Sequence, residues 1–257
     1  MLKQNSLASV GGTALMRDYK IELENRVYFI RNLLARTGAK GIVYGNSGGK
    51  DSTLTGILCK TACENTVGVI MPCQSKRNFN EDMEDARAIA KQYHIKTLTV
   101  DLTKAKEVLC DNISPLLRTT SQAKSNIAPR LRMTTLYTIA QSLDGLVCGT
   151  GNYSERYMGY FTKWGDGGYD FNPIADLTVT EVYEFLEYLH VPQRIIKKAP
   201  SAGLFDGQTD EEELGITYSQ LDDYILKNNG SSVTISRIAV AHKKTEHKRK
   251  MPISYGF

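Results

Sequence analysis

Apolar positions form two alternating kinds of segment along the first 150 residues. Short β-type apolar runs occupy 41–44, 66–70, 96–100 and 145–148. Between these runs the apolar residues recur at helical spacing, which predicts helices over 52–63, 80–93, 103–117 and 128–143. Strands that alternate with helices predict a doubly wound α/β fold. Its sheet is mostly parallel and carries helices on both faces, because each parallel crossover lays a helix on the sheet.

Patterns on either side of this region predict the rest of the chain. A stripe that includes Leu23, Val27 and Ile30 predicts a helix over about 15–37, ending near Gly38. Residues 150–176 are rich in Gly and aromatic side chains without a clear period, as in a functional loop region. A helix that Thr178 caps and Pro192 closes follows next. The remaining predictions are a long lid-like loop over 191–214, helices at 217–228 and 232–242, and a basic tail at 243–250.

Composition narrows the class of protein. The chain has 257 residues, 41% of them hydrophobic, and a formal net charge of +4, so we expect one globular domain over 1–257 with its α/β core at about 40–190. The small net charge does not indicate a nucleic-acid binder. Five cysteines without a C-x-x-C pair favour reduced thiols. No apolar run reaches the roughly 18 residues of a membrane span, and the N-terminus lacks the apolar segment of a signal peptide, so we expect a cytoplasmic protein.

The stretch between the first predicted strand and the next helix carries the clearest chemistry. Small residues there let backbone N–H groups approach a phosphate, and the following helix N-terminus adds a favourable dipole. Asp51 would repel that phosphate unless a cation lay between them, so we predict a bridging Mg²⁺ ion. The predicted phosphate-binding residues are Gly45, Asn46, Ser47, Gly48, Gly49, Lys50, Asp51 and Ser52.

This loop differs from two common phosphate-binding motifs. A Walker A loop would need Gly at 44 and Ser or Thr at 51, where the chain has Tyr44 and Asp51. The nearest approach to G-x-G-x-x-G starts at Gly149 and lacks the third glycine. A glycine turn with a polar helix cap and no ligand is the structural alternative, but such a cap does not require two Ser, two adjacent Gly and an Asp.

The segment S-G-G-K-D-S at 47–52 resembles the signature of the ATP pyrophosphatase superfamily, whose members split ATP between its α and β phosphates. Further segments look like NAD synthetase, a family within it. These segments are NIAPRLRMT from 126, GTGNYSE from 149, GYFTKWGDGGYD from 159, PIADL from 173, TDEEELGITY at 209–218 and EHKR at 246–249. The resemblance runs in order from about residue 20 to the tail. It implies an adenine nucleotide alpha hydrolase-like fold and a homodimer that makes NAD from deamido-NAD, ATP and ammonia.

The resemblance also implies site residues. The 45–52 loop would hold the ATP phosphates, Asp51 and Glu155 would bind Mg²⁺, and Thr150 and Ser201 would contact ATP. The deamido-NAD contacts would fall on Arg130, Lys163, Asp170, His247 and Lys248. Three cations facing a pyrophosphate and a carboxylate are electrostatically sensible. Taken alone, the tail would indicate a solvated charge run or a nucleic-acid patch, but its E-H-K-R match favours substrate contact.

One position departs from the family. The family commonly has a Lys after P-I-A-D-L that reaches the ATP phosphates, and the aligned residue here is Val179. Val179 continues an apolar stripe, so we expect it in the core. Lys50 could supply the missing contact. The acidic cluster Asp210 to Glu213 is expected to be a solvated face.

The implied reaction has two steps: the nicotinate carboxylate attacks the α-phosphorus of ATP, and ammonia then displaces AMP from the adenylate. Glutamine-using members carry an amidase domain, and only about twenty residues precede the resembling region, so free ammonia is the expected donor. Two alternatives share the loop: a tRNA-modifying enzyme and a nucleotide-binding module without turnover. The small charge and the absence of paired cysteines count against the first.

Overall fold

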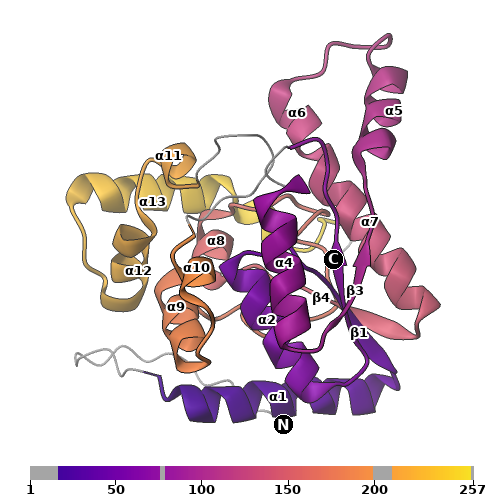
Figure 1. Ribbon diagram of the computed structural model, residues 1–257. Helices are drawn as coiled ribbons and strands as arrows, with labels where there is room; N and C mark the ends of the chain where they lie inside the picture. Colours follow the sequence, from indigo (N-terminus) through magenta and orange to yellow (C-terminus); the bar gives the residue numbers. More distant parts are fainter. Residues whose placement is uncertain (1–16, 76–78, 199–209, 256–257) are drawn as a thin grey trace.

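The computed structural model describes residues 17–75, 79–198 and 210–255. Within these residues the chain builds a parallel sheet from β1 (Gly41–Gly45), β2 (Thr66–Ile70), β3 (Lys96–Thr99) and β4 (Gly145–Cys148). The strand order is β3-β2-β1-β4 (Figure 1). Every predicted strand is confirmed to within a residue.

Helices cover both faces of this sheet, as the alternating pattern predicts. They are α1 (Tyr19–Thr37), α2 (Lys50–Ala62), α4 (Glu81–Gln92), α5 (Thr103–Ile113), α6 (Ser121–Ser125) and α7 (Ile127–Ser142). The first core cluster joins β1 to α1, α2, α4 and α9 (Val179–Tyr188), and the second joins the other face of the sheet to α7. The predicted helix over 103–117 ends early, at Ile113, and α5 and α6 project beyond the sheet (Figure 1).

Tyr44 fills the space between the sheet and α2. Its side chain is fully buried, and its ring lies against the backbone of Gly56 on α2 and Gly68 on β2. A Cβ at Gly56 would overlap the Tyr44 hydroxyl, and one at Gly68 would lie 3.1 Å from it. The tyrosine therefore leaves no room for a side chain at Gly56 and makes one at Gly68 a tight fit.

The C-terminal part packs beside this core. It contains α8 (Tyr153–Met158), α9, α10 (Gln193–Ile196), α11 (Asp210–Leu214), α12 (Tyr218–Lys227), α13 (Ser232–Lys244) and a 3-10 turn at Glu246–Lys248. Thr178 caps α9 through a capping box with Glu181, as predicted. Val179 is 3% exposed in an apolar cluster with Met158, Leu221 and Ile238, so its assignment to the core is confirmed.

Two sequence expectations for this part are wrong. The segment 191–214 is not loop throughout, because α10 and α11 lie within it; residues 199–209 are outside the described ranges. Pro192 does not close α9, which ends at Tyr188, but caps the start of α10. The short apolar stretch before residue 197 forms a single helical turn that buries Ile195.

Ion pairs fasten α1 to the segment before α9. The guanidinium of Arg26, buried on α1, donates to both carboxylate oxygens of Asp176, at 2.6 and 3.0 Å. Arg17 donates to Asp176 at 3.1 Å and to Glu181 at 2.6 Å. This bidentate pair and its neighbours hold the N-terminal helix against the rest of the fold.

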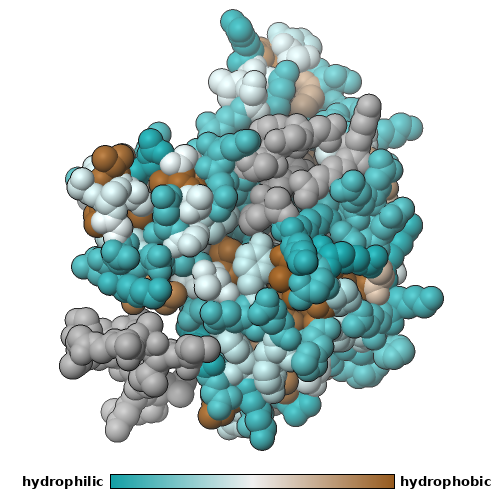
Figure 2. Space-filling view, turned by 60° about the vertical axis from the view of Figure 1, so that its left-hand side comes forward, coloured by the Kyte–Doolittle hydropathy of each residue, from teal (hydrophilic) through white to brown (hydrophobic). Residues whose placement is uncertain are grey.

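The remaining expectations concern membrane spans and the state of the cysteine thiols. None of the described helices has the length and apolar character that a membrane span requires. All five cysteines are free thiols, as expected. The face shown in Figure 2 is mostly hydrophilic, and its hydrophobic residues gather only in small separate patches.

Candidate functional site

The main cavity opens where two loops leave neighbouring strands. Strand β1 continues into the 45–49 loop and α2, and β4 continues into 149–152 and α8. The chain crosses from β1 to β2 on one side and reaches β4 on the other, so these strand ends form the topological switch point of the sheet. Ligands of open α/β sheets bind at this point. The cavity there measures about 970 Å³.

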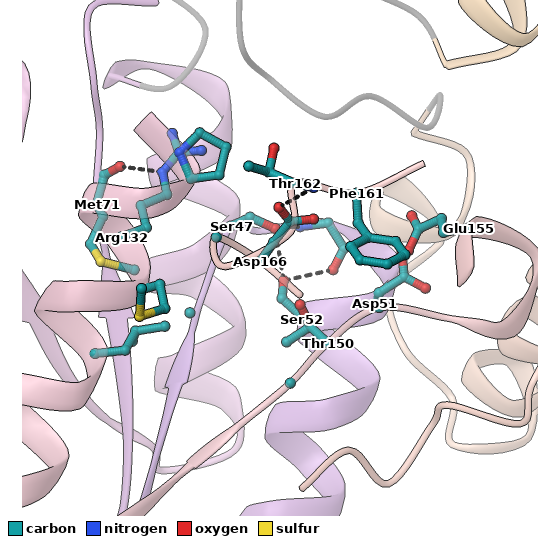
Figure 3. A pocket seen from close by; sticks show the side chains of 18 of the residues that line it. Ser47, Asp51, Ser52, Met71, Arg132, Thr150, Glu155, Phe161, Thr162 and Asp166 are labelled. Atoms are coloured by element: carbon teal, nitrogen blue, oxygen red, sulfur yellow. Dashed lines mark hydrogen bonds between the residues drawn. The ribbon is translucent and has the colours of Figure 1, made fainter. Parts of the chain in front are cut away.

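The 45–52 loop lines this cavity with small polar groups. Ser47 Oγ lies 3.1 Å from Ser52 Oγ and accepts a hydrogen bond from the N–H of Gly49 (Figure 3). Gly49 caps α2 without a side-chain acceptor, so N–H groups of the first turn stay available for an anion. Gly48 faces away from the cavity, with φ at +73°. The other predicted loop residues line it.

Two carboxylates come together at the end of this loop. Asp51 lies in the first turn of α2, Glu155 lies in the first turn of α8, and both line the same side of the cavity (Figure 3). Asn152, fully buried, connects them. Its amide donates to Asp51 Oδ1 at 3.1 Å and its backbone N–H donates to Glu155 Oε2 at 3.1 Å.

Lys50 neutralises part of this negative charge from within the protein. Its Nζ lies 2.7 Å from Asp51 Oδ2, and it sits 5.9 and 5.8 Å from the ring centres of Tyr183 and Tyr218. Burial opposes the charge on Lys50, but Asp51 and Glu155 outweigh it and raise the pKa of the lysine. Burial, followed by repulsion from Asp51, raises the pKa of Glu155 well above its ordinary value. A second cation would relieve this repulsion.

The donor set suits a hard divalent ion with few protein ligands. Among the described residues no group of three or more His, Cys, Asp or Glu side chains could hold a metal. Asp51 and Glu155 offer carboxylate oxygens, and the phosphate loop beside them would bring phosphate oxygens. Mg²⁺ is commonly held by one or two carboxylates together with water and substrate phosphates.

The opposite part of the cavity is more apolar. Its lining there includes Met71, Met133, Leu136 and Val147. Arg132 enters from α7 and donates from Nε to the Met71 carbonyl at 3.2 Å (Figure 3). Burial lowers the pKa of Arg132 and raises that of Asp166, which accepts from the Thr162 N–H at 2.9 Å. An apolar lining with a few polar groups is the usual form of a small-molecule site.

The predicted substrate residues lie in two places. Arg130 donates to the Lys163 carbonyl at 3.4 Å, and Lys163 Nζ donates to the His247 carbonyl at 2.6 Å, so these three form one chain of contacts. Lys248, next in sequence, lines the cavity and donates to the carbonyls of Gly159 and Phe161 at 2.7 Å each. Arg130, Lys163 and His247 do not line it.

The other predicted residues are placed as follows. Thr150 lines the cavity between β4 and α8. Asp170 does not line it; its carboxylate accepts from the Val147 N–H at 2.7 Å and from the Tyr137 hydroxyl at 3.1 Å. Ser201 lies outside the described residues.

Sequence reasoning missed several cavity residues. Asp210 is 3% exposed, lines the cavity and accepts from the Tyr218 hydroxyl at 3.1 Å, so the expectation that the 210–213 cluster is a solvated face is wrong for its first member. The negative charge of the cluster predicts solvent exposure and gives no sign that one face of α11 lies against the cavity. Asn152, Arg132 and Lys198 were also missed. The first two lie inside segments that the resemblance already marked.

The strand order and the cavity at its switch point define a doubly wound α/β protein with a ligand site between β1 and β4. Comparison with known proteins narrows this class. The family model described as NAD synthase matches residues 22–252, and the chain therefore belongs to the NAD synthase family, whose members are ligases.

Individual relatives agree with this assignment. The chain is 44% identical over 241 residues to the NH(3)-dependent NAD(+) synthetase of Carboxydothermus hydrogenoformans, covering 91% of this chain and 97% of that one. Among solved structures, the NMN synthetase from Francisella tularensis has a TM-score of 0.89 at 36% identity, with 94% and 100% of the chains covered. The NH3-dependent NAD synthetase from Campylobacter jejuni has a TM-score of 0.75 at 29% identity, with 93% and 99% covered. The expected family and fold class are confirmed.

Proposed function

We propose that this chain is an ammonia-dependent NAD synthetase. It amidates the nicotinate carboxyl of deamido-NAD, consumes ATP, and releases AMP and pyrophosphate. The observation that carries the proposal is the pairing of Asp51 and Glu155 beside a phosphate loop at the switch point, in a chain whose curated relatives are named NH(3)-dependent NAD(+) synthetases.

Asp51 and Glu155 would hold Mg²⁺ in this site. When bound, the ion neutralises phosphate charge and so eases the approach of a carboxylate to the α-phosphorus. The N–H groups of the α2 first turn and the hydroxyls of Ser47 and Ser52 bind the phosphates. Thr150 and Ser201 are proposed ATP contacts.

The two-step reaction needs no protein nucleophile. A carboxylate oxygen of the substrate forms a bond to the α-phosphorus, and the bond from that phosphorus to the β-phosphate bridging oxygen breaks, so pyrophosphate leaves. Ammonia then attacks the acyl carbon, AMP leaves with the former carboxylate oxygen, and the nitrogen gives up a proton. The protein aligns two anions that repel each other and keeps water from the adenylate.

Cationic groups outside the phosphate loop would bind the second substrate. Arg130, Lys163 and His247 form one contact chain, and Lys248 reaches the cavity from the same segment. We assign deamido-NAD to this region and to Asp170. A homodimer in the cytoplasm is also part of the proposal, without a nucleic-acid or membrane partner.

A second candidate function is amidation of the same carboxyl group in a different substrate, in which a mononucleotide instead of a dinucleotide carries the nicotinate ring. The Francisella NMN synthetase has a TM-score of 0.89, against 0.75 for the Campylobacter NAD synthetase. That relation favours testing nicotinic acid mononucleotide, the acid that corresponds to NMN, as an alternative substrate. The chemistry at the carboxyl group is the same for both.

One assay tests the proposal. Purified protein is incubated with ATP, Mg²⁺ and either deamido-NAD or nicotinic acid mononucleotide, with ammonium or glutamine as nitrogen source, and the amide product and pyrophosphate are measured together. NAD formed with ammonium supports the proposal, and a preference for the mononucleotide supports the second candidate. Nucleotide binding without pyrophosphate release under every condition would contradict both.

A further inference from the structure

The phosphate loop packs directly against the start of α4. Gly48 has no room for a side chain, because a Cβ there would overlap the Asp82 carbonyl and lie 3.1 Å from the Asp85 Cβ. The Asn46 amide also donates to the Ala86 carbonyl at 3.0 Å. The carboxylates of Asp82 and Asp85 therefore belong to the helical turn that touches the loop, where they would repel a polyphosphate.

Lys198, two residues after the end of α10, pairs with both of these carboxylates. Its Nζ lies 2.8 Å from Asp82 Oδ1 and 2.7 Å from Asp85 Oδ2. The lysine and Asp82 both line the cavity, together with Ser47 and Gly49 of the loop. The lysine side chain is only 14% exposed. An ammonium group has three N–H donors, so it can bind a phosphate oxygen beside the carboxylates.

Three further cations, Lys50, Arg132 and Lys248, also line the cavity. Each has a protein partner, and Arg132 donates to the Met71 carbonyl at 3.2 Å. Lys198 differs from them in pairing with both carboxylates of the helical turn that packs against the loop. Val179 occupies the position of the family's phosphate-contacting lysine and is buried in an apolar cluster. Lys50 pairs with Asp51 and is 6% exposed. Lys248 donates to the backbone carbonyls of Gly159 and Phe161.

We propose that Lys198 binds the pyrophosphate half of ATP and so supplies the contact that Val179 cannot make. This inference rests on the proposed use of ATP. The ammonium bridges the Asp82 and Asp85 carboxylates and the β and γ phosphate oxygens, so that one cation both screens the two carboxylates and stabilises the charge of the leaving pyrophosphate. Lys198 contributes from the segment after α10, whereas the loop binds the phosphates through N–H groups and hydroxyls.

The test compares two neighbouring lysines. Lys198→Gln removes the ammonium and keeps a polar end for Asp82 and Asp85, whereas Lys197→Gln removes the same charge from an exposed side chain. Calorimetry with Mg²⁺ measures the binding of inorganic pyrophosphate and of AMP to each variant. We expect Lys198→Gln to weaken pyrophosphate binding by roughly tenfold or more and to leave AMP binding unchanged. Lys197→Gln should bind both ligands as the unmodified chain does.

Two further measurements separate this role from a structural one. In steady-state kinetics, the inhibition constant of pyrophosphate should rise in Lys198→Gln while that of AMP stays constant, and Lys198→Arg should recover most of the pyrophosphate affinity. Unchanged pyrophosphate binding in Lys198→Gln, or equal losses for pyrophosphate and AMP, would overturn the inference. If the unmodified chain binds neither ATP nor pyrophosphate, the proposed function itself fails.

Discussion

Asn152 hydrogen-bonds directly to Asp51, a residue 101 positions earlier in the chain, through its side-chain amide at 3.1 Å. The same residue donates its backbone N–H to Glu155 and accepts the Glu155 N–H on its side-chain oxygen at 3.0 Å. One buried asparagine therefore fixes both carboxylates that would bind the metal. Such partners of metal ligands tune affinity without touching the metal.

Replacing Asn152 by Ala should weaken metal binding while the phosphate loop stays intact. We expect the Mg²⁺ concentration for half-maximal activity to rise about tenfold, because outer partners of this kind typically contribute tenfold or more. Electron paramagnetic resonance of Mn²⁺ in the presence of ATP measures the same loss without turnover. Asn172→Ala is the control, since that amide donates to the Gly151 carbonyl and to no carboxylate. Equal Mg²⁺ requirements in the two variants would contradict the prediction.

Asp51→Asn should abolish turnover and leave the fold intact. The substitution removes one carboxylate charge from the Asp51 and Glu155 pair, so activity should fall by about a hundredfold or more. Product formation and thermal unfolding of the same preparation are the measurements. Asp111→Asn, on the exposed side of α5, should behave as the unmodified chain. Near-normal turnover in Asp51→Asn would contradict the proposal that Asp51 is a metal ligand.

The Tyr44 hydroxyl offers a test of core packing. It is buried and has no hydrogen-bond partner among the described residues, so Tyr44→Phe should stabilise the fold by about 1 kcal/mol, because an unpaired polar group leaves the core. Gly56→Ala should destabilise it by about 1–3 kcal/mol, since the added methyl group overlaps that hydroxyl. Denaturant unfolding of both variants measures the change in the free energy of unfolding. A loss of stability in Tyr44→Phe would contradict the prediction, because it would show that the hydroxyl has a stabilising partner.

Asp176 should make stability depend on pH in the acid range. Burial opposes its ionisation, but Arg26 and then Arg17 outweigh burial and lower the pKa of the carboxyl below 3.8. Its stabilising effect is therefore complete above pH 3.8, the ordinary value, and is lost as the pH falls through the lower folded value. Asp176→Asn should reduce the melting temperature at neutral pH, and the difference from the unmodified chain should shrink below pH 3.8.

A matched control exists for this prediction. Asp144 pairs with Lys40 at 2.8 Å. The carboxylates of Asp144 and Asp176 are both more than half exposed, but Lys40 is exposed whereas Arg26, the partner of Asp176, is buried. Ion pairs between two exposed side chains contribute little. Asp144→Asn should leave the melting temperature almost unchanged at every pH. A constant difference between Asp176→Asn and the unmodified chain from neutral to acid pH would show that the ion pair is not its cause.

Local patterns in the sequence were sufficient to predict the strands and the main helices of the core. Period and capping residues located the strands and main helices because these signals act within a few residues, as in the Thr178 and Glu181 capping box. The small residues between the first strand and the next helix located the loop, and the resemblance located Glu155. Neither could show that Lys198 reaches Asp82 and Asp85, or that Asn152 joins Asp51 to Glu155. These contacts arise only when segments about a hundred residues apart pack together.

The burial of Asp210, in the acidic cluster at 210–213, is a second feature that the sequence alone could not predict. A run of four acidic residues predicts solvent exposure, since isolated carboxylates are costly to bury. Asp210 is nevertheless enclosed, because Tyr218 on α12 donates to it and α11 presents that face to the cavity. The position of one helix relative to another decides the burial of such a residue, and no window of sequence contains that information.

Parallel pairing of β1 with β4 has a consequence for the place of the proposed reaction. Asp51 and Glu155, the proposed metal ligands, lie in helices that follow these two neighbouring strands. Gly41 is in register with Gly145, and hydrogen-bonded strands lie about 4.8 Å apart. The backbone hydrogen bonds between the two strands therefore fix the spacing of the loops that lead to α2 and α8, and with it the place of the proposed phosphoryl transfer. Under the proposed function, a substrate with a different carrier of the nicotinate ring would therefore react at the same place, between the ends of β1 and β4.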